Sequence, residues 1–180
     1  MDEPKLDPKE VLCDSTKFLD FTIRGTRWVF DRDPEKEYAP MLVAYLIGAD
    51  GVAPALGTLE GQSADERAAD AFKMGIKVGR KAGGMQLEAI SFISEAWMSQ
   101  SETKDIKVMP RDDPNRKEVI AILTKVRGQK IKSANIEIKR GINSSGNVVR
   151  MLDEHVQIMD GIIEALIIKA FEYGMESVKP

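Results

Sequence analysis

The chain has 180 residues, of which 43% are hydrophobic and 31% are charged, and 26 basic against 29 acidic residues give a formal net charge of −3. This is the composition of a globular protein of one domain, and the near balance of charge argues against a broad phosphate-binding surface. One cysteine and one histidine exclude an intramolecular disulfide, a cysteine-rich zinc site and any motif that needs two histidines.

The N-terminal residues 1–6 are polar and acidic, and they lack the basic and then apolar pattern of a secretory signal. No uninterrupted apolar run approaches the length of a membrane span. We therefore expect a cytoplasmic protein that does not enter a membrane. We expect residues 1–6 to form a flexible tail and residues 7–180 to form a single domain.

The first helix is expected to begin at Pro8, with Asp7 as its N-cap and Glu10 in its first turn. Residues 21–30 carry two competing signals. Aromatic residues and a glycine share one helical face, whereas several β-branched residues favour a strand. We favour a helix here.

A β-hairpin is predicted next. Residues 41–47 are apolar and strand-like, Asp50 and Gly51 supply a tight turn, and residues 52–59 form the returning strand. Because proline cannot donate a ladder hydrogen bond, Pro54 predicts an edge position or a bulge.

Residues 62–82 have the clearest helical pattern, with Ser63 as the N-cap and two glycines after the end. Small residues recur along one stripe, which would let the helix lie close against a sheet; they are Ala68, Ala71, Gly75, Gly79 and Ala82. The glycines lie inside and after the helix rather than before it, so the pattern does not indicate a phosphate-binding loop.

The strand predicted at residues 87–98 is apolar on both faces, which is typical of a central strand covered on both sides. It nevertheless carries Ser91, Ser94 and Glu95. A carboxylate in such a run needs a partner or a wet cavity. Glu95 is therefore the strongest single indication of a site.

Three further strands are predicted at residues 119–126, 131–139 and 148–152, followed by a helix at residues 156–175 that is deeply buried or forms a subunit interface. The fold class is therefore α+β, with a largely antiparallel sheet of five or six strands and the order α-ββ-α-ββββ-α. This order is similar to that of profilin-like and roadblock-like modules, although order alone does not determine function.

Two segments, Ser94–Met98 and Asp113–Glu118, resemble segments of a group of small uncharacterised prokaryotic proteins. The resemblance covers roughly the second half of the chain. No activity is established for that group, so the resemblance implies no catalytic or binding residues. It implies only that the two segments matter together.

These segments define a candidate pocket or ion-pair cluster formed by Glu95, Trp97, Arg111, Asp113, Arg116 and Glu118. In one interpretation Glu95 has a pKa raised by burial and acts as an acid or a base. In the other, Glu95 pairs with Arg111 or Arg116 and fixes the loop to the strand. The second interpretation is favoured because no other catalytic group can be assigned.

Other chemistry is less well supported. Acidic residues at 112–113 could join Glu95 or Glu118 around a divalent cation, but their spacing fits no calcium loop, and Asp-Asp-Pro is also a common turn. His155 could form a triad with Ser91 or Ser94, but no Gly-x-Ser-x-Gly motif is present. We expect no metal and no cofactor.

Basic residues concentrate on one predicted hairpin, at Lys125, Arg127, Lys130, Lys132, Lys139 and Arg140. No aromatic residues lie between them to stack on bases, so nucleic-acid binding is not favoured. Lysines at a sheet edge instead discourage pairing with other strands.

The sequence thus predicts a non-catalytic module that forms a homo-oligomer or binds a protein partner. The apolar surface of residues 162–171 and the two tryptophans, Trp28 and Trp97, motivate this prediction. The alternative is an enzyme or small-ligand-binding protein with a pocket beside Glu95, with Trp97, Arg116 and Glu118 as neighbours.

Overall fold

A computed structural model describes residues 7–35, 37–98, 113–159 and 165–178. Its helices are α1 (Pro8–Val11), α2 (Ser15–Arg32), α3 (Ala64–Lys81) and α4 (Leu166–Glu176). Its strands are β1 (Met41–Gly48), β2 (Gly51–Thr58), β3 (Gln86–Met98), β4 (Lys117–Val126), β5 (Lys132–Ile142) and β6 (Val148–Met159).

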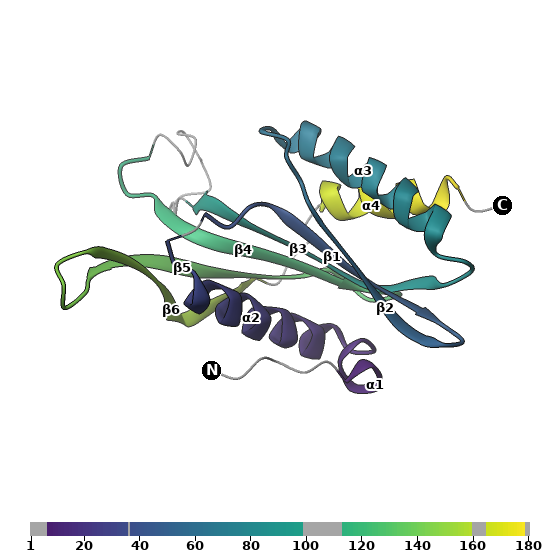
Figure 1. The fold of residues 1–180 in the computed structure, drawn as a ribbon, viewed down its shortest axis with the longest axis horizontal. Coiled ribbons are helices and arrows are strands. Elements are labelled where there is room, and N and C mark those ends of the chain that lie inside the picture. The colour runs from purple at the N-terminus through teal and green to yellow at the C-terminus, as the bar shows by residue number, and fades with distance from the viewer. Residues whose placement is uncertain (1–6, 36, 99–112, 160–164, 179–180) are drawn as a thin grey trace.

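The six strands form one sheet in the order β2-β1-β3-β4-β5-β6, and every neighbouring pair is antiparallel. Helix α2 lies on one face of the sheet, and α3 and α4 lie together on the other (Figure 1). The predicted α+β class and the antiparallel sheet are confirmed, with six strands.

Residues 21–30, which carry competing indications of helix and strand in the sequence, lie within helix α2, so the prediction of a helix is confirmed. Its N-cap is Asp14, whose carboxylate accepts hydrogen bonds from the amides of Thr16 and Lys17, so the helix that begins at Pro8 stops after one turn and a second one starts. The threonine hydroxyls inside α2 donate to backbone carbonyls one turn earlier, which satisfies them in a buried position.

The predicted hairpin of β1 and β2 is confirmed. The turn at Asp50 and Gly51 is closed by Gly51 with φ of 123°, a conformation that favours glycine. Strand β2 lies at one edge of the sheet, which explains how Pro54 is accommodated.

The small-residue stripe of α3 packs against α4 rather than against the sheet, so that part of the prediction is wrong. A Cβ atom at Gly75 would collide with the carbonyl oxygen of Phe171, and a Cβ atom at Gly174 would collide with that of Phe72. The two helices therefore approach closely because each presents a glycine to the other's backbone. The N-terminus of α3 is as predicted, with Ser63 and Glu66 forming a capping box.

Strand β3 occupies the interior of the sheet between β1 and β4, as predicted. Its Ile90 and Phe92 pack in the core under α3 and α4. Ile93, on the opposite face, packs in the core under α2. The strand is therefore covered on both sides.

The C-terminal part differs from the prediction. Strand β6 has 12 residues and continues to Met159, and α4 begins only at Leu166, so residues 156–159 are strand and not helix. Val156 pairs with Ile136 on β5, and a register irregularity near Ile138 lets β6 carry extra residues there. Residues 160–164, which the prediction also placed in the helix, lie outside the described residues.

Candidate functional site

Glu95 on β3 is held by two groups. Its Oε1 lies 2.8 Å from Nη2 of Arg150 on β6, and it accepts a hydrogen bond of 2.6 Å from the backbone amide of Tyr38. The side chain of Glu95 is 18% exposed and that of Arg150 is 10% exposed. Glu95 thus pairs with an arginine, as expected, but the partner among the described residues is Arg150; the expected partners were Arg111 or Arg116, and Arg111 lies outside the described residues.

The ion pair extends into a network on the same side of the sheet. Nη2 of Arg150 also lies 3.2 Å from Oε1 of Glu118 on β4, and Oε2 of Glu118 lies 2.8 Å from Nη2 of Arg140 on β5. The guanidinium of Arg150 lies 5.4 Å from the ring centre of Phe30 on α2. Two carboxylates and two guanidiniums thus alternate, which neutralises the charges and joins the four strands from β3 to β6.

The other predicted residues lie around this network without completing a catalytic arrangement. The guanidinium of Arg116 stacks 4.5 Å from the ring centre of Trp97, which is exposed at the end of β3. Asp113 closes a turn by accepting a hydrogen bond from the amide of Asn115 at 2.8 Å. Arg111 lies outside the described residues.

Arg150 was missing from the predicted set. The sequence does contain an indication of this role. Arg150 lies in the apolar segment Val148–Leu152, two residues before Leu152, so both side chains point to the same face of the strand, where Leu152 packs against the core. A charge at that position needs a partner, and Glu95 was the carboxylate that lacked one.

The histidine–serine triad is not assembled. His155 lies within β6 rather than at a strand–helix junction, and its side chain is exposed. Ser91 and Ser94 lie on β3, separated from β6 by two strands, which places the backbones roughly 14 Å apart at the usual strand spacing.

Four cations of the predicted basic hairpin are paired with carboxylates: Lys125 with Glu172, Arg127 with Glu88, Lys139 with Asp153, and Arg140 with Glu118. Their positive charge is therefore balanced locally. Within the described ranges, no group of three or more His, Cys, Asp or Glu side chains could hold a metal ion. None of the described helices is long and apolar enough to cross a membrane.

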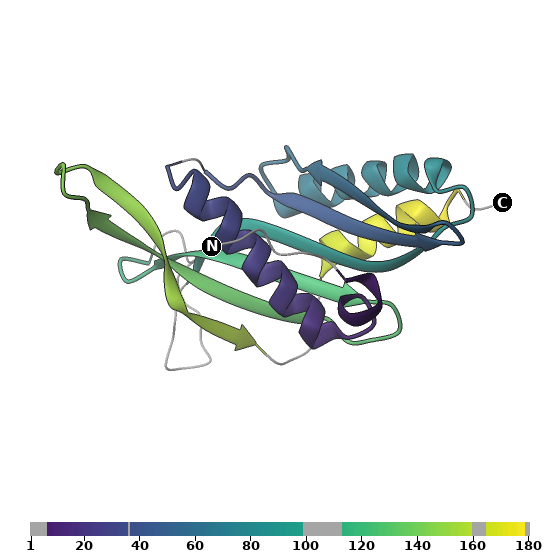
Figure 2. The same cartoon turned by 60° about the horizontal axis from the view of Figure 1, so that its bottom comes forward.

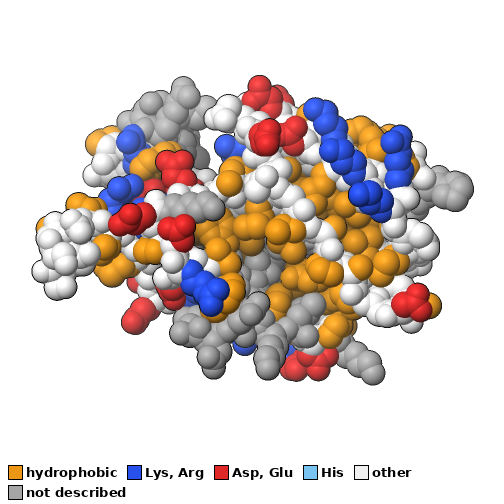
Figure 3. All heavy atoms as spheres, viewed as in Figure 1, with side chains coloured by type: hydrophobic (Ala, Val, Ile, Leu, Met, Phe, Trp, Pro, Cys, Tyr) orange, Lys and Arg blue, Asp and Glu red, His pale blue; other side chains and the backbone are white. Residues whose placement is uncertain are grey.

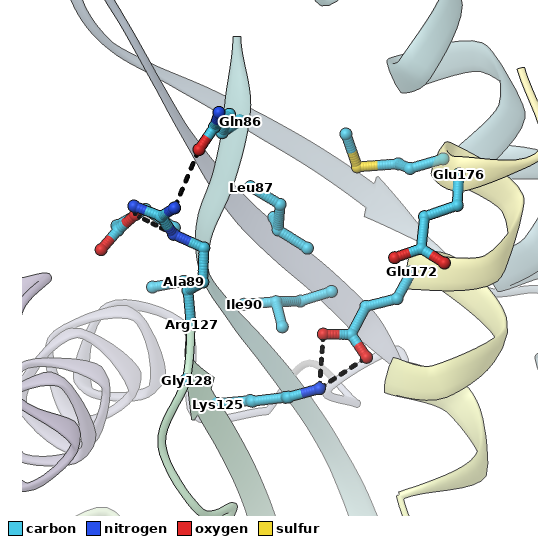
Figure 4. A pocket seen from close by; sticks show the side chains of 11 residues that line it. Gln86, Leu87, Ala89, Ile90, Lys125, Arg127, Gly128, Glu172 and Glu176 are labelled. Carbon is cyan, nitrogen blue, oxygen red and sulfur yellow. Dashed lines mark hydrogen bonds and ion pairs between the residues drawn. The ribbon is translucent and has the colours of Figure 1, made fainter. Parts of the chain in front are cut away.

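A polar cleft of about 220 Å³ lies where β3 and β4 meet α4 (Figure 4). Nζ of Lys125 bridges both carboxylate oxygens of Glu172 at 2.6 and 2.7 Å. Arg127 donates to the carboxylate of Glu88 and the amide oxygen of Gln86, each at 2.8 Å. Both cations are therefore already paired: Lys125 attaches α4 to the sheet, and Arg127 joins β4 to β3.

A larger and more apolar groove, called here the α2 groove, has a volume of about 400 Å³ and lies between α2 and strands β1 to β3. None of the lining residues that the structure describes carries a charge. They are Phe21, Thr22, Gly25, Thr26, Trp28, Val29, Tyr38, Met41, Val43, Tyr45, Leu56, Ser91 and Ile93. The groove adjoins the Glu95 network through Tyr38, but Glu95, Trp97, Arg116 and Glu118 do not line it.

Comparison with known proteins identified no relative: no family model, no curated protein and no solved structure matches this chain.

Proposed function

We propose that the protein is a non-catalytic module that self-associates through the free edge of β6. Strand β6 is the last strand of the sheet and, among the described strands, pairs only with β5. Its 12 residues make it longer than β2, the strand at the opposite edge, which has eight. A long free edge offers backbone amides and carbonyls to another strand.

The observation that carries the proposal is the position of exposed apolar side chains. Half of the large hydrophobic residues that are exposed in the described part of the chain lie on β5 and β6; they are Ile142, Val148, Met151, Ile158 and Met159. Exposed apolar side chains gathered along one hairpin support a surface that is covered by a partner.

The β5–β6 hairpin also projects away from the helices, so neither helical layer covers its tip (Figure 2). Ile142, at the end of β5, is 76% exposed. A projecting hairpin is accessible to a second copy without rearrangement of the core.

The middle of β6 is already engaged within the chain. Nη2 of Arg27 on α2 donates to the carbonyl oxygens of Asp153 at 2.6 Å and Glu154 at 3.1 Å. The proposed pairing therefore uses the stretches on either side, Val148–Leu152 and Val156–Met159. Two-fold symmetric dimers are the commonest assemblies of identical chains, and two β6 edges would pair in this way.

The other edge of the sheet, formed by β2, is less suited to pairing with a second copy than β6 is. Strand β2 contains Pro54, which cannot donate a backbone hydrogen bond to a neighbouring strand. Its exposed Leu56 supplies a matched control position.

Light scattering during size-exclusion chromatography, over a range of loading concentrations, tests the proposal. The wild-type protein is expected to show dimers that dissociate on dilution, and the double variant Met151→Lys/Ile158→Lys is expected to be monomeric with an unchanged circular dichroism spectrum. The control Leu56→Lys should dimerise as the wild type does. A wild-type protein that is monomeric at every concentration, or a control that is equally disrupted, would overturn the proposal.

A further inference from the structure

We infer that the α2 groove binds a neutral, largely apolar small molecule that carries a hydrogen-bonding group. The inference concerns a different surface from the edge of β6 and stands without it. It begins from the uneven covering of the sheet. Helix α2 packs mainly over β4 and β5 and reaches β1 through the ring contacts of Phe18 and Phe21 with Tyr45, so the same face of β1 is only partly covered by the helix.

The floor of the groove follows from strand alternation. Leu42, Ala44 and Leu46 of β1 are buried in the core under α3 and α4. Val43 and Tyr45 therefore point to the opposite face, where they line the groove beside α2. Apolar side chains are also exposed over β1 and β2 on the face seen in Figure 3.

Size and charge favour a small neutral ligand. The volume of about 400 Å³ lies in the range of small-molecule sites, which are mostly apolar with a few polar groups. The described lining residues carry no charge, and the guanidinium of Arg32 beside the groove is already engaged 4.1 Å from the ring centre of Trp28, so a charged ligand would lose its hydration without a dedicated counter-charge.

The polar side chains among the described residues of the groove are uncharged hydroxyls. Ser91 lies in the floor and is 2% exposed. Thr22 and Thr26 donate to the carbonyl oxygens of Phe18 and Thr22 at 2.9 and 2.8 Å, and Thr26 also shares a side-chain hydrogen bond with the phenol of Tyr38, so the hydroxyl of Thr22 keeps its capacity to accept. Burial raises the pKa of Tyr38 to about 12, which keeps its phenol neutral at ordinary pH. Such a site recognises a ligand by one or two neutral hydrogen bonds.

Nile red, an uncharged aromatic dye, is a suitable probe, because its fluorescence rises in apolar surroundings. Titration is expected to show one saturable site per chain. Trp28 lines the groove, and Trp97 does not. In the variant Trp97→Phe, saturation should therefore quench the emission of the single remaining tryptophan. The anionic dye anilinonaphthalene sulfonate should bind at least tenfold more weakly.

Gly25→Leu is the decisive variant. Gly25 lies on α2 and lines the groove, so a leucine there should fill part of the space and weaken Nile red binding at least tenfold. Leucine also favours a helix over glycine, so the melting temperature should not fall. Leu56→Lys, which places a charge at the exposed rim, is a second variant with the same expected loss.

Controls separate this site from the edge of β6. Ile142→Ser and Met151→Lys/Ile158→Lys should bind the dye as the wild type does. The inference is overturned if the wild type binds no dye, if the edge variants abolish binding, or if folded Gly25→Leu and Leu56→Lys bind normally. A ligand that proves to be an extended peptide, competing with the dye, would also overturn it.

Discussion

Arg150 and Glu95 form an ion pair with a nitrogen–oxygen distance of 2.8 Å although they lie on strands β6 and β3, which are separated by β4 and β5. Their side chains meet over the two intervening strands, beside Phe30 at the end of α2. The carboxylate that the sequence marked as a candidate acid or base is therefore held in a structural contact. This arrangement favours a structural role for Glu95.

Replacing Glu95 with glutamine should lower the free energy of unfolding by about 1–3 kcal/mol. The reason is that Arg150 keeps its positive charge in a mostly buried position and loses one of the two carboxylates that balance this charge. Chemical denaturation measures this change. Glu10→Gln is the control, since Glu10 pairs with Lys17 in an exposed position and its loss should cost less than about 1 kcal/mol. Equal stability of Glu95→Gln and the wild type would contradict the structural role.

Because α3 and α4 lie so close together, we expect that the glycines at their contact, Gly75 and Gly174, cannot be replaced without loss of stability. Gly75→Ala and Gly174→Ala should each destabilise the protein by about 1–3 kcal/mol, since a Cβ atom would meet backbone atoms of the other helix. Gly25→Ala, at the groove of α2, is the matched control and should be neutral or stabilising by up to about 1 kcal/mol. Thermal unfolding distinguishes these outcomes. Similar melting temperatures for all three variants would show that the helices do not pack as described.

The raised pKa of Tyr38 predicts that the folded protein loses stability at alkaline pH. Burial raises its pKa from 10.0 to about 12, so between these values the folded chain keeps a proton that the unfolded chain loses. The stability that this tyrosine contributes is fully present below pH 10 and should fall by about 1.4 kcal/mol per pH unit as the pH rises towards 12. Denaturation curves at several alkaline pH values, compared with those of Tyr38→Phe, measure this slope. Parallel curves for the two proteins would show that Tyr38 titrates as in the unfolded chain.

The elements with strong local signals could be predicted from the sequence. Ser63 with Glu66 marks the start of α3, and the Asp50–Gly51 turn marks the first hairpin, because each depends on neighbouring residues alone. The central position of β3 was also predictable, since its two apolar faces require cover on both sides.

The errors arose where a local pattern has two solutions that only tertiary contacts distinguish. Val156 and Met159 fit a helical stripe, but pairing with β5 makes residues 156–159 strand. The small residues of α3 indicated a close neighbour without indicating whether it was a sheet or a helix. The pairing of Arg150 with Glu95 depends on the order of the strands, which the sequence does not state.

Amide hydrogen exchange at two protein concentrations tests the self-association of β6 most directly. If two copies pair along this edge, amides in both Val148–Leu152 and Val156–Met159 should exchange more slowly in the concentrated sample, while those of β2 should be unchanged. The Met151→Lys/Ile158→Lys variant should lose this difference. Exchange of β6 amides that is the same at both concentrations, in a sample that light scattering shows to be associated, would contradict the account.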